Sequence, residues 1–187
     1  QPRGAGKHPL TQFILQTLVI SGFLITSILL KEISTSSFSM KDFWLRRFRR
    51  ILPAVVFIII TVLLLAPFLI FWGDIESLTS DAIAALFSYA NFHALFNFGD
   101  YWGSTAENSF FLHSWSLSLE EQFYFFYPLF LLLLYKTKQP IFTWLVVIVV
   151  LSLFAFAYGT YNYPTITFYM LPTRAWELAA GGLLAAF

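Results

Sequence analysis

Long apolar stretches alternate with short polar segments along the whole chain. Three stretches carry no charged residue over about the length of a membrane span, namely Leu10–Leu30, Ile51–Trp72 and Pro140–Tyr158. A helix needs about 20 mostly apolar residues to cross a hydrocarbon core about 30 Å thick, so the pattern predicts three spanning helices. Within the first, Ser21 and Gly22 are small residues that would let another helix approach closely.

A fourth apolar stretch, Leu78–Phe98, is interrupted by polar side chains that include Asp81, Asn91 and His93. It fits either a span that packs against the protein interior or a re-entrant, interfacial helix. A fifth stretch, Phe110–Tyr135, is strongly apolar but holds an acidic insert near its middle.

A last helix is expected to start at Pro172 and to run into the small residues Ala179–Gly182. Taken together, the stretches predict an all-α protein. We expect a polytopic transmembrane helical bundle with five to six membrane-embedded helices, which form a single domain over residues 1–187.

Positive charge is concentrated in the connectors. The polar connector Lys31–Arg50 holds six of the eleven Lys and Arg residues, so the positive-inside rule predicts that it is cytoplasmic. Pro53 is then expected in the first turn of the following span. The short basic connector Lys136–Gln139 also favours the cytoplasm, yet it falls outside if every stretch crosses fully. The two connectors agree only if Leu78–Phe98 does not fully cross, and both arrangements stay open.

Composition supports a membrane protein and excludes several other classes. Of the 187 residues, 58% are hydrophobic and 11% are charged, against roughly 25% charged in an average soluble domain. A soluble globule, a disordered chain, collagen and a coiled coil are therefore all disfavoured. There is no cysteine, which excludes a disulfide scaffold, a thiolate metal site and a cysteine nucleophile. No His and carboxylate cluster with metal-ligand spacing is present, and one juxtamembrane basic cluster does not imply nucleic acid.

The two ends of the sequence resemble cut ends. The chain begins at Gln1 and closes inside the apolar run Leu178–Phe187, which is too short to cross a bilayer. We therefore expect an internal fragment of a longer membrane protein.

A polar stripe is predicted on the fifth stretch. If it is helical from His113, five side chains fall within about 80° of one another at 100° per residue. They are His113, Ser116, Glu120, Tyr124 and Tyr127. An imidazole, a hydroxyl, a carboxylate and two phenols can bind a polyhydroxy substrate and move protons. The alternative is that Glu120 ties a neighbouring helix through a buried ion pair and that His113 is an ordinary interfacial histidine.

Arg174 and Glu177 lie three residues apart on the last helix, so they can form an intrahelical pair. Direct contact with a substrate is the second interpretation, because charges inside a membrane are functional candidates.

Four arginines stand before the second span, in the string LRRFRRILP. Arg47 and Arg50 share a helical face and could clamp a phosphate, since guanidinium groups bind phosphate oxygens bidentately. The alternative is a topology signal or a contact with anionic membrane lipid.

Four strings, in order, resemble one family. They are SGFLIT (Ser21–Thr26), FWLRRFRRILPA (Phe43–Ala54), HSWSLSLEEQFYFFYPL (His113–Leu129) and LPTRAWELAAGGLLA (Leu171–Ala185). The chain resembles, from about residue 19 to its end, the acyltransferase 3 family of bacterial integral-membrane O-acyltransferases.

The resemblance implies an enzyme of the bacterial cytoplasmic (inner) membrane that takes an acyl group, usually acetyl, from cytoplasmic acyl-CoA. The acceptor would be a hydroxyl of an extracytoplasmic carbohydrate such as O-antigen, peptidoglycan or exopolysaccharide, and an esterase-like extracytoplasmic domain could be fused or could act as a partner. By the same resemblance, Arg46, Arg47 and Arg50 would meet the phosphates of coenzyme A. The catalytic candidates are Glu120, Glu121 and His113, and the structural or substrate-binding candidates are Arg174, Glu177, Ser116 and Tyr124.

One feature of the family has no counterpart here. Its essential histidine lies on the first transmembrane helix, upstream of the SGFLIT segment, and His8 does not stand in for it in sequence or spacing. The chain by itself is therefore expected to be catalytically incomplete. In an intact protein that histidine would be the base and Glu120, which the helix phase favours over Glu121, would orient it.

A second function class is a transporter or flippase whose intramembrane Glu and Arg residues handle protons or a polar solute. A third is a non-catalytic assembly module. The enzyme hypothesis predicts that the helices enclose a hydrated, charged interior shared by the two glutamates, Arg174 and the arginines. It also predicts coenzyme A binding, which the transporter and the assembly module do not.

Overall fold

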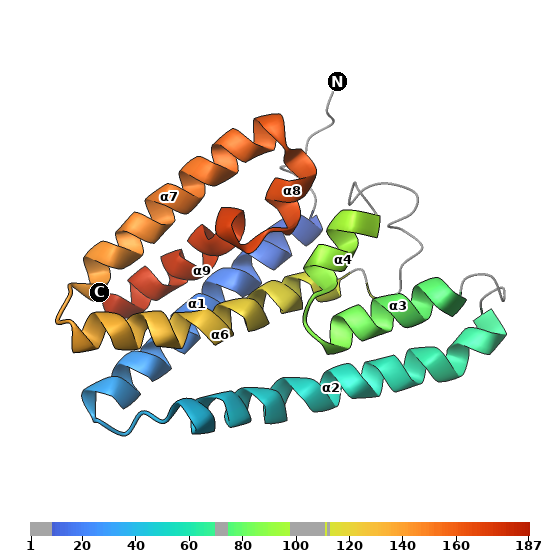
Figure 1. Ribbon diagram of the computed structural model, residues 1–187, viewed down its shortest axis with the longest axis horizontal. Coiled ribbons are helices and arrows are strands. Elements are labelled where there is room, and N and C mark those ends of the chain that lie inside the picture. Colours follow the sequence, from blue (N-terminus) through green and yellow to red (C-terminus); the bar gives the residue numbers. More distant parts are fainter. Residues whose placement is uncertain (1–8, 70–74, 98–110, 112) are drawn as a thin grey trace. The chain divides into compact units, whose positions relative to one another are not determined.

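A computed structural model describes residues 9–69, 75–97, 111 and 113–187 of the chain (Figure 1). Every regular element in these ranges is an α-helix, which confirms the all-α prediction. The helices are α1 Pro9–Ser34, α2 Met40–Leu69, α3 Ile75–Leu86, α4 Ala90–Asn97, α6 Ser114–Lys136, α7 Ile141–Asn162, α8 Pro164–Tyr169 and α9 Leu171–Ala186.

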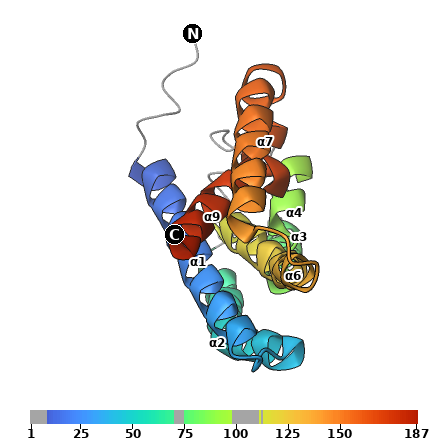
Figure 2. The same cartoon turned by 90° about the vertical axis from the view of Figure 1, so that its left-hand side faces the viewer.

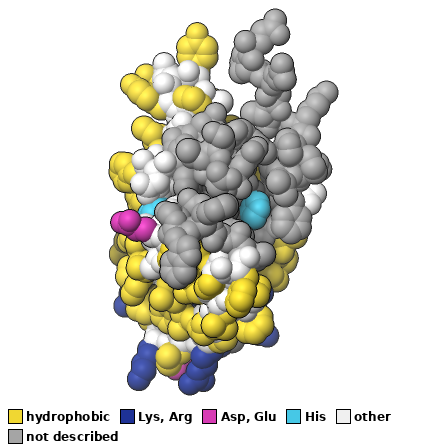
Figure 3. All heavy atoms as spheres, turned by 90° about the vertical axis from the view of Figure 1, so that its right-hand side faces the viewer, with side chains coloured by type: hydrophobic (Ala, Val, Ile, Leu, Met, Phe, Trp, Pro, Cys, Tyr) yellow, Lys and Arg dark blue, Asp and Glu magenta, His cyan; other side chains and the backbone are white. Residues whose placement is uncertain are grey.

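Four of the described helices are long and apolar enough to cross a membrane. Their candidate spans are Leu15–Ser34, Met40–Phe68, Ser114–Lys136 and Ile141–Asn162. On the face drawn in Figure 3, hydrophobic side chains predominate among the described residues, and Lys and Arg side chains gather at the lower end. Exposed apolar surface of this kind suits contact with lipid, and the chain is a multi-pass membrane protein.

The chain divides into two compact units, which are described separately. Unit 1 comprises residues 1–38, 123–167 and 171–187, and unit 2 comprises residues 39–122 and 168–170. In unit 1, α9 packs against both α1 and α7 (Figure 2). Gly22 lies where α1 meets α9, as the sequence predicted, because a Cβ at this position would overlap the carbonyl oxygen of Leu178.

Unit 2 is built on α2, which packs against α3 through a small apolar cluster. Its members are Ile59, Val62 and Ala66 of α2, Leu78, Ala82 and Ala85 of α3, and Phe111. Residues 87–89 separate α3 from α4, and Ser88 adopts a left-handed backbone conformation with a φ of 58°. The chain then reverses into α4, which packs on α3.

The fourth apolar stretch is therefore two short helices. With 12 and 8 residues, α3 and α4 are about 18 and 12 Å long at 1.5 Å per residue, and neither reaches across a core of about 30 Å. This favours the second alternative of the sequence analysis, a segment that does not fully cross. With α1, α2, α6 and α7 as crossings, both basic connectors fall on one side of the membrane, as the positive-inside rule predicts.

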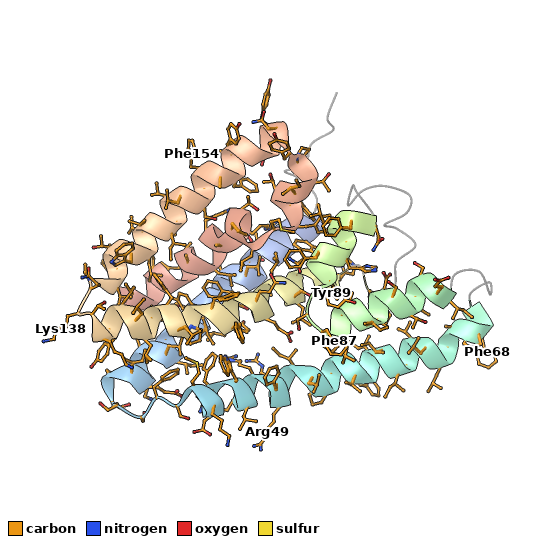
Figure 4. All side chains as sticks on the ribbon, in the orientation of Figure 1. Arg49, Phe68, Phe87, Tyr89, Lys138 and Phe154 are labelled. Atoms are coloured by element: carbon orange, nitrogen blue, oxygen red, sulfur yellow. The ribbon has the colours of Figure 1, made fainter. Side chains whose placement is uncertain are left out.

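The connector Lys31–Arg50 is shorter than predicted. Because α1 continues to Ser34 and α2 begins at Met40, all four arginines lie on α2, and Pro53 lies well inside that helix rather than in its first turn. Ser39 Oγ accepts the Asp42 N–H at 3.4 Å, which caps the helix start, and the Asp42 carboxylate suits the positive end of the helix dipole. Figure 4 shows Arg49 in the first half of α2 and Phe68 near the end of this helix.

Candidate functional site

The arginine face of α2 consists of Arg46, Arg47 and Arg50. At 100° per residue these three positions span about 100° of the helix circumference, and Arg49 lies outside that arc. The Arg47 guanidinium carbon lies 5.7 Å from the centre of the buried Phe43 ring, a cation–π contact that orients the group. Arg46 and Arg50 are exposed. The face thus presents three cations of unit 2, one of them held in place.

The acidic pair, Glu120 and Glu121, lies in the first half of α6, and both side chains are half-buried. As consecutive residues they point about 100° apart, so they face different surroundings. The structure confirms that both lie on a continuous helix long enough to span. Their predicted roles in catalysis stay predictions.

The predicted stripe needs one correction. His113 is exposed and lies in the turn before α6, which begins at Ser114, so it is not part of the helical face. The side chain of Ser116 donates a hydrogen bond to the His113 carbonyl at 3.1 Å and closes this turn. The catalytic assignment of His113 stays a prediction.

Further along the stripe, Tyr124 and Tyr127 are buried in unit 1. The hydroxyl of Tyr127 lies 2.7 Å from Oγ1 of Thr26, and Thr26 in turn donates to the Gly22 carbonyl at 2.7 Å. Tyr127 therefore joins α6 to α1, which is a packing role that the stripe prediction did not include.

A second polar face of α6, which the sequence analysis missed, holds α4 in unit 2. Ser118 Oγ accepts the N–H of Ala90, the first residue of α4, at 3.1 Å and so satisfies one of the helix's unpaired donors. Gln122 donates to the Asn91 side-chain oxygen at 2.8 Å and to the Ser88 carbonyl at 3.1 Å. The spacing of Ser118 and Gln122 was the available signal, since residues four apart share a helical face.

Asn91 extends the same network to the segment before α9. Its amide donates to the Tyr169 carbonyl at 3.2 Å. The Tyr169 ring packs edge to face on the fully buried Trp115, with ring centres 5.6 Å apart. These contacts fix the start of α6 within unit 2 and hence the direction in which its half-buried glutamates project.

Arg174 and Glu177 form the intrahelical pair that the spacing predicted, inside unit 1. The Arg174 Nη2 atom lies 2.7 Å from Glu177 Oε1 and donates to Oε2 at 2.9 Å, and Nε donates to Oε2 at 3.3 Å. Only 4% and 1% of the two side chains are exposed. A pair this buried must stay neutral overall, so the two charges compensate each other.

The start of α9 is held by α7. Ser152 Oγ donates to the Pro172 carbonyl at 2.7 Å and accepts the Trp176 N–H at 3.0 Å. This positions the first turn of α9, from which Arg174 projects. The predicted interior shared by the glutamates, Arg174 and the arginine face involves both units and stays a prediction.

Comparison with known proteins decides the family. Residues 18–187 match the family described as "Acyltransferase domain", Acyl_transf_3. The chain belongs to this acyltransferase family. The match begins within α1 and includes all the later described helices, so the resemblance carried by the four sequence strings is confirmed.

Several curated relatives of this acyltransferase-family chain are similar over most of its length. One is the peptidoglycan O-acetyltransferase OatA of Listeria monocytogenes, which is 37% identical over 89% of the chain and 28% of the relative. A putative O-acetyltransferase of Staphylococcus aureus (strain COL) is 36% identical over 89% of the chain and 28% of the relative. A Haemophilus influenzae protein is 34% identical over 90% of the chain and 72% of the relative. The chain thus spans little more than a quarter of two of these proteins. No solved structure matches it.

Proposed function

We propose that this chain is the membrane-embedded part of an O-acyltransferase of the bacterial inner membrane. It moves an acyl group, in the simplest case acetyl, from cytoplasmic acyl-CoA to a hydroxyl of a cell-envelope carbohydrate. The observation that carries the proposal is the family match over residues 18–187. Two relatives, a peptidoglycan O-acetyltransferase and a putative O-acetyltransferase, support the reaction class and a cell-wall glycan as acceptor.

The donor site of the proposal is the arginine face of α2. Coenzyme A carries several phosphate groups, and Arg46, Arg47 and Arg50 present guanidinium groups on one arc of the helix. The cation–π contact with Phe43 fixes Arg47, so less side-chain freedom is lost when it binds a phosphate. Because the positive-inside rule makes the connector before α2 cytoplasmic, this face meets the compartment that supplies acyl-CoA.

The chemistry of the proposal requires a base that removes the proton of the acceptor hydroxyl while its oxygen attacks the thioester carbonyl. Glu120 is proposed to orient that base, with Glu121, His113, Ser116 and Tyr124 as further site residues. Arg174 and Glu177 neutralise each other in the structure, so their proposed contribution is to hold α9 in place rather than to bind a free anion. An extracytoplasmic esterase-like domain, fused or separate, stays part of the proposal as a partner.

Equilibrium binding of acetyl-CoA to the chain in detergent micelles tests the donor site. Arg47→Ala and Arg50→Ala are each expected to weaken binding at least about tenfold, because a charge-assisted hydrogen bond contributes about 1.5–3 kcal/mol. Arg47→Lys should also weaken binding, since an ammonium group cannot bind bidentately. Arg49→Ala removes an equal charge from the same helix outside the arginine face and should change binding less than about twofold.

Two results would overturn the donor site. One is that Arg49→Ala weakens acetyl-CoA binding as much as Arg47→Ala does. Binding would then depend on the total positive charge of α2 and not on the arginine face. The other is the absence of acetyl-CoA binding together with binding or transport of a polar solute, which is the outcome that a transporter predicts.

A further inference from the structure

A cluster of three side chains in unit 2 has no part in the proposed acyl transfer. Ser80 and Asp81 are consecutive residues of α3, and His93 lies on α4. The Nε2 atom of His93 lies 2.6 Å from Oγ of Ser80, within hydrogen-bond distance. Its Nδ1 atom lies 3.3 Å from Oδ1 of Asp81. The imidazole therefore stands between a hydroxyl, which it meets at hydrogen-bond distance, and a carboxylate. The contact with Asp81 is within ion-pair distance and is not a formed hydrogen bond.

The fold holds this cluster in place while leaving it accessible. The Asp81 side chain is buried, with 4% exposed, whereas His93 keeps 14% of its side chain exposed and Ser80 is half-buried. The backbone carbonyl of Tyr89, in the break between α3 and α4 (Figure 4), accepts the backbone N–H of His93 at 3.0 Å. The Tyr89 ring lies edge-on to the imidazole, with the ring centres 6.5 Å apart. Further support comes from Ser118, which caps the start of α4.

The geometry favours one neutral tautomer of the imidazole. A carboxylate beside Nδ1 favours the neutral tautomer that carries its hydrogen on Nδ1, so that Nε2 accepts from the Ser80 hydroxyl. A hydroxyl, an imidazole and a carboxylate in this order are the arrangement that activates a serine as a nucleophile. We propose that Ser80, His93 and Asp81 form a nucleophilic site that takes an acyl group from an activated ester or thioester onto Ser80.

The proposed step balances as follows. The Ser80 oxygen attacks the carbonyl carbon of the donor while its proton passes to His93 Nε2. The bond from that carbon to the leaving oxygen or sulfur then breaks, and the leaving group takes the proton from His93. The product is an ester on Ser80. An acceptor hydroxyl or water reverses the sequence, losing its proton to His93 and freeing Ser80. In both directions Asp81 positions the imidazole and steadies its charged form, without contact to the donor.

The site also lies on a suitable side of the membrane. By the topology above, α3 and α4 follow the end of α2 that is opposite the basic connector 35–39, where a carbohydrate acceptor would be. An ester on Ser80 is therefore open to an extracytoplasmic hydroxyl. The proposal goes beyond the proposed function, because an aryl ester can acylate Ser80 in a chain that does not bind coenzyme A.

Peptide mass spectrometry of the full chain in micelles after reaction with p-nitrophenyl acetate, or with diisopropyl fluorophosphate, tests the nucleophile directly. The label is expected on Ser80 and on no other serine at comparable yield. Ser80→Ala and His93→Gln should abolish it. Thr79→Ala is the matched control, since the Thr79 hydroxyl is exposed and bonds only to its own helix at the Ile75 carbonyl in the described contacts; it should label at the wild-type rate.

The absence of cysteine from the chain allows a second test that does not depend on ester chemistry. In Ser80→Cys the introduced thiol is the only one, and His93 should hold it partly as thiolate. Iodoacetamide should then alkylate it about tenfold faster at pH 7 than it alkylates the thiol of Thr79→Cys, because the thiolate is the reacting form. Adding His93→Gln should remove the difference.

Asp81 has its own readout as a positioning residue. Asp81→Asn should slow acylation of Ser80 at least about tenfold with the KM for the ester unchanged, and Asp81→Glu should recover part of the rate. Labelling spread over several serines, or equal alkylation of the two introduced thiols, would show that the three residues only hold α4 against α3. Failure of acetyl-CoA binding would leave this outcome unaffected, so the two proposals fail separately.

Discussion

Gly22 of α1 and Gly181 of α9 lie where the two helices cross in unit 1, and neither position has room for a methyl group. A Cβ built on Gly22 would overlap the Leu178 carbonyl oxygen, and one built on Gly181 would overlap the Val19 carbonyl oxygen. Both obstacles are backbone atoms that cannot rotate aside. Replacing either glycine by alanine therefore forces α1 and α9 apart.

The size of the effect follows from two opposing contributions. Alanine is favoured over glycine inside a helix by about 1 kcal/mol. Overfilling a packed contact costs about 1–3 kcal/mol, and a backbone obstacle places these sites at the upper end. Separation also loosens the contact around Leu18, Ile25 and Leu178, which are at most 1% exposed. We expect each variant to lose about 1–2 kcal/mol of unfolding free energy.

Thermal unfolding in mild detergent, followed by circular dichroism, measures this loss. For a chain of this length, about 1–2 kcal/mol corresponds to a fall in Tm of roughly 2–8 °C. The double variant should lose less than the sum of the two, since one separation relieves both overlaps. Gly182→Ala is the control, because its Cβ would lie 2.9 Å from the side-chain ends of Thr26 and Tyr127, and it should lose less. An unchanged or raised Tm for both crossing variants would refute the reasoning.

Two further predictions concern buried polar groups. Glu177→Gln removes the carboxylate that pairs with the buried Arg174 guanidinium and should lower the unfolding free energy by about 3 kcal/mol, whereas replacing both residues by Leu should cost less than either single change. Denaturant titration checks this, and a single-variant loss below about 1 kcal/mol would contradict it. Asn91→Leu and Gln122→Leu should show a coupling free energy of about 1 kcal/mol in a double-mutant cycle, because either single substitution already removes the hydrogen bond between the two amides. Additive losses of stability would mean that the two amides do not support each other.

The sequence predicted the features that depend on local composition. The three uncharged stretches correspond to α1, α2 and α7, because the part of a helix that lies in lipid must be mostly apolar. The spacing of Arg174 and Glu177 predicted their pairing, since residues three apart on a helix are neighbours. The small size of Gly22 predicted a site of close helix contact, because only a small residue lets another backbone approach.

The features that depend on distant contacts were not predicted. The break at Ser88 and the start of α4 are held by Ser118 and Gln122, which lie 28 and 34 residues away from their partners in sequence. The predicted stripe assumed that only one face of α6 makes polar contacts, yet α6 carries hydrogen bonds on two faces. Periodicity identifies a face but not what packs on it. The cluster around His93 likewise needed the reversal between α3 and α4.

The most direct test of the account is the side and the site at which an acyl-CoA photoprobe reacts. A membrane-impermeant, photoreactive acetyl-CoA analogue is added to sealed vesicles that hold the chain in a single known orientation, and the cross-linked peptide is identified by mass spectrometry. The account predicts cross-linking only from the side that exposes the connector 35–39, within the first turns of α2, and its loss with excess coenzyme A. Equal labelling from both sides, or cross-links away from α2 that coenzyme A does not compete, would contradict it.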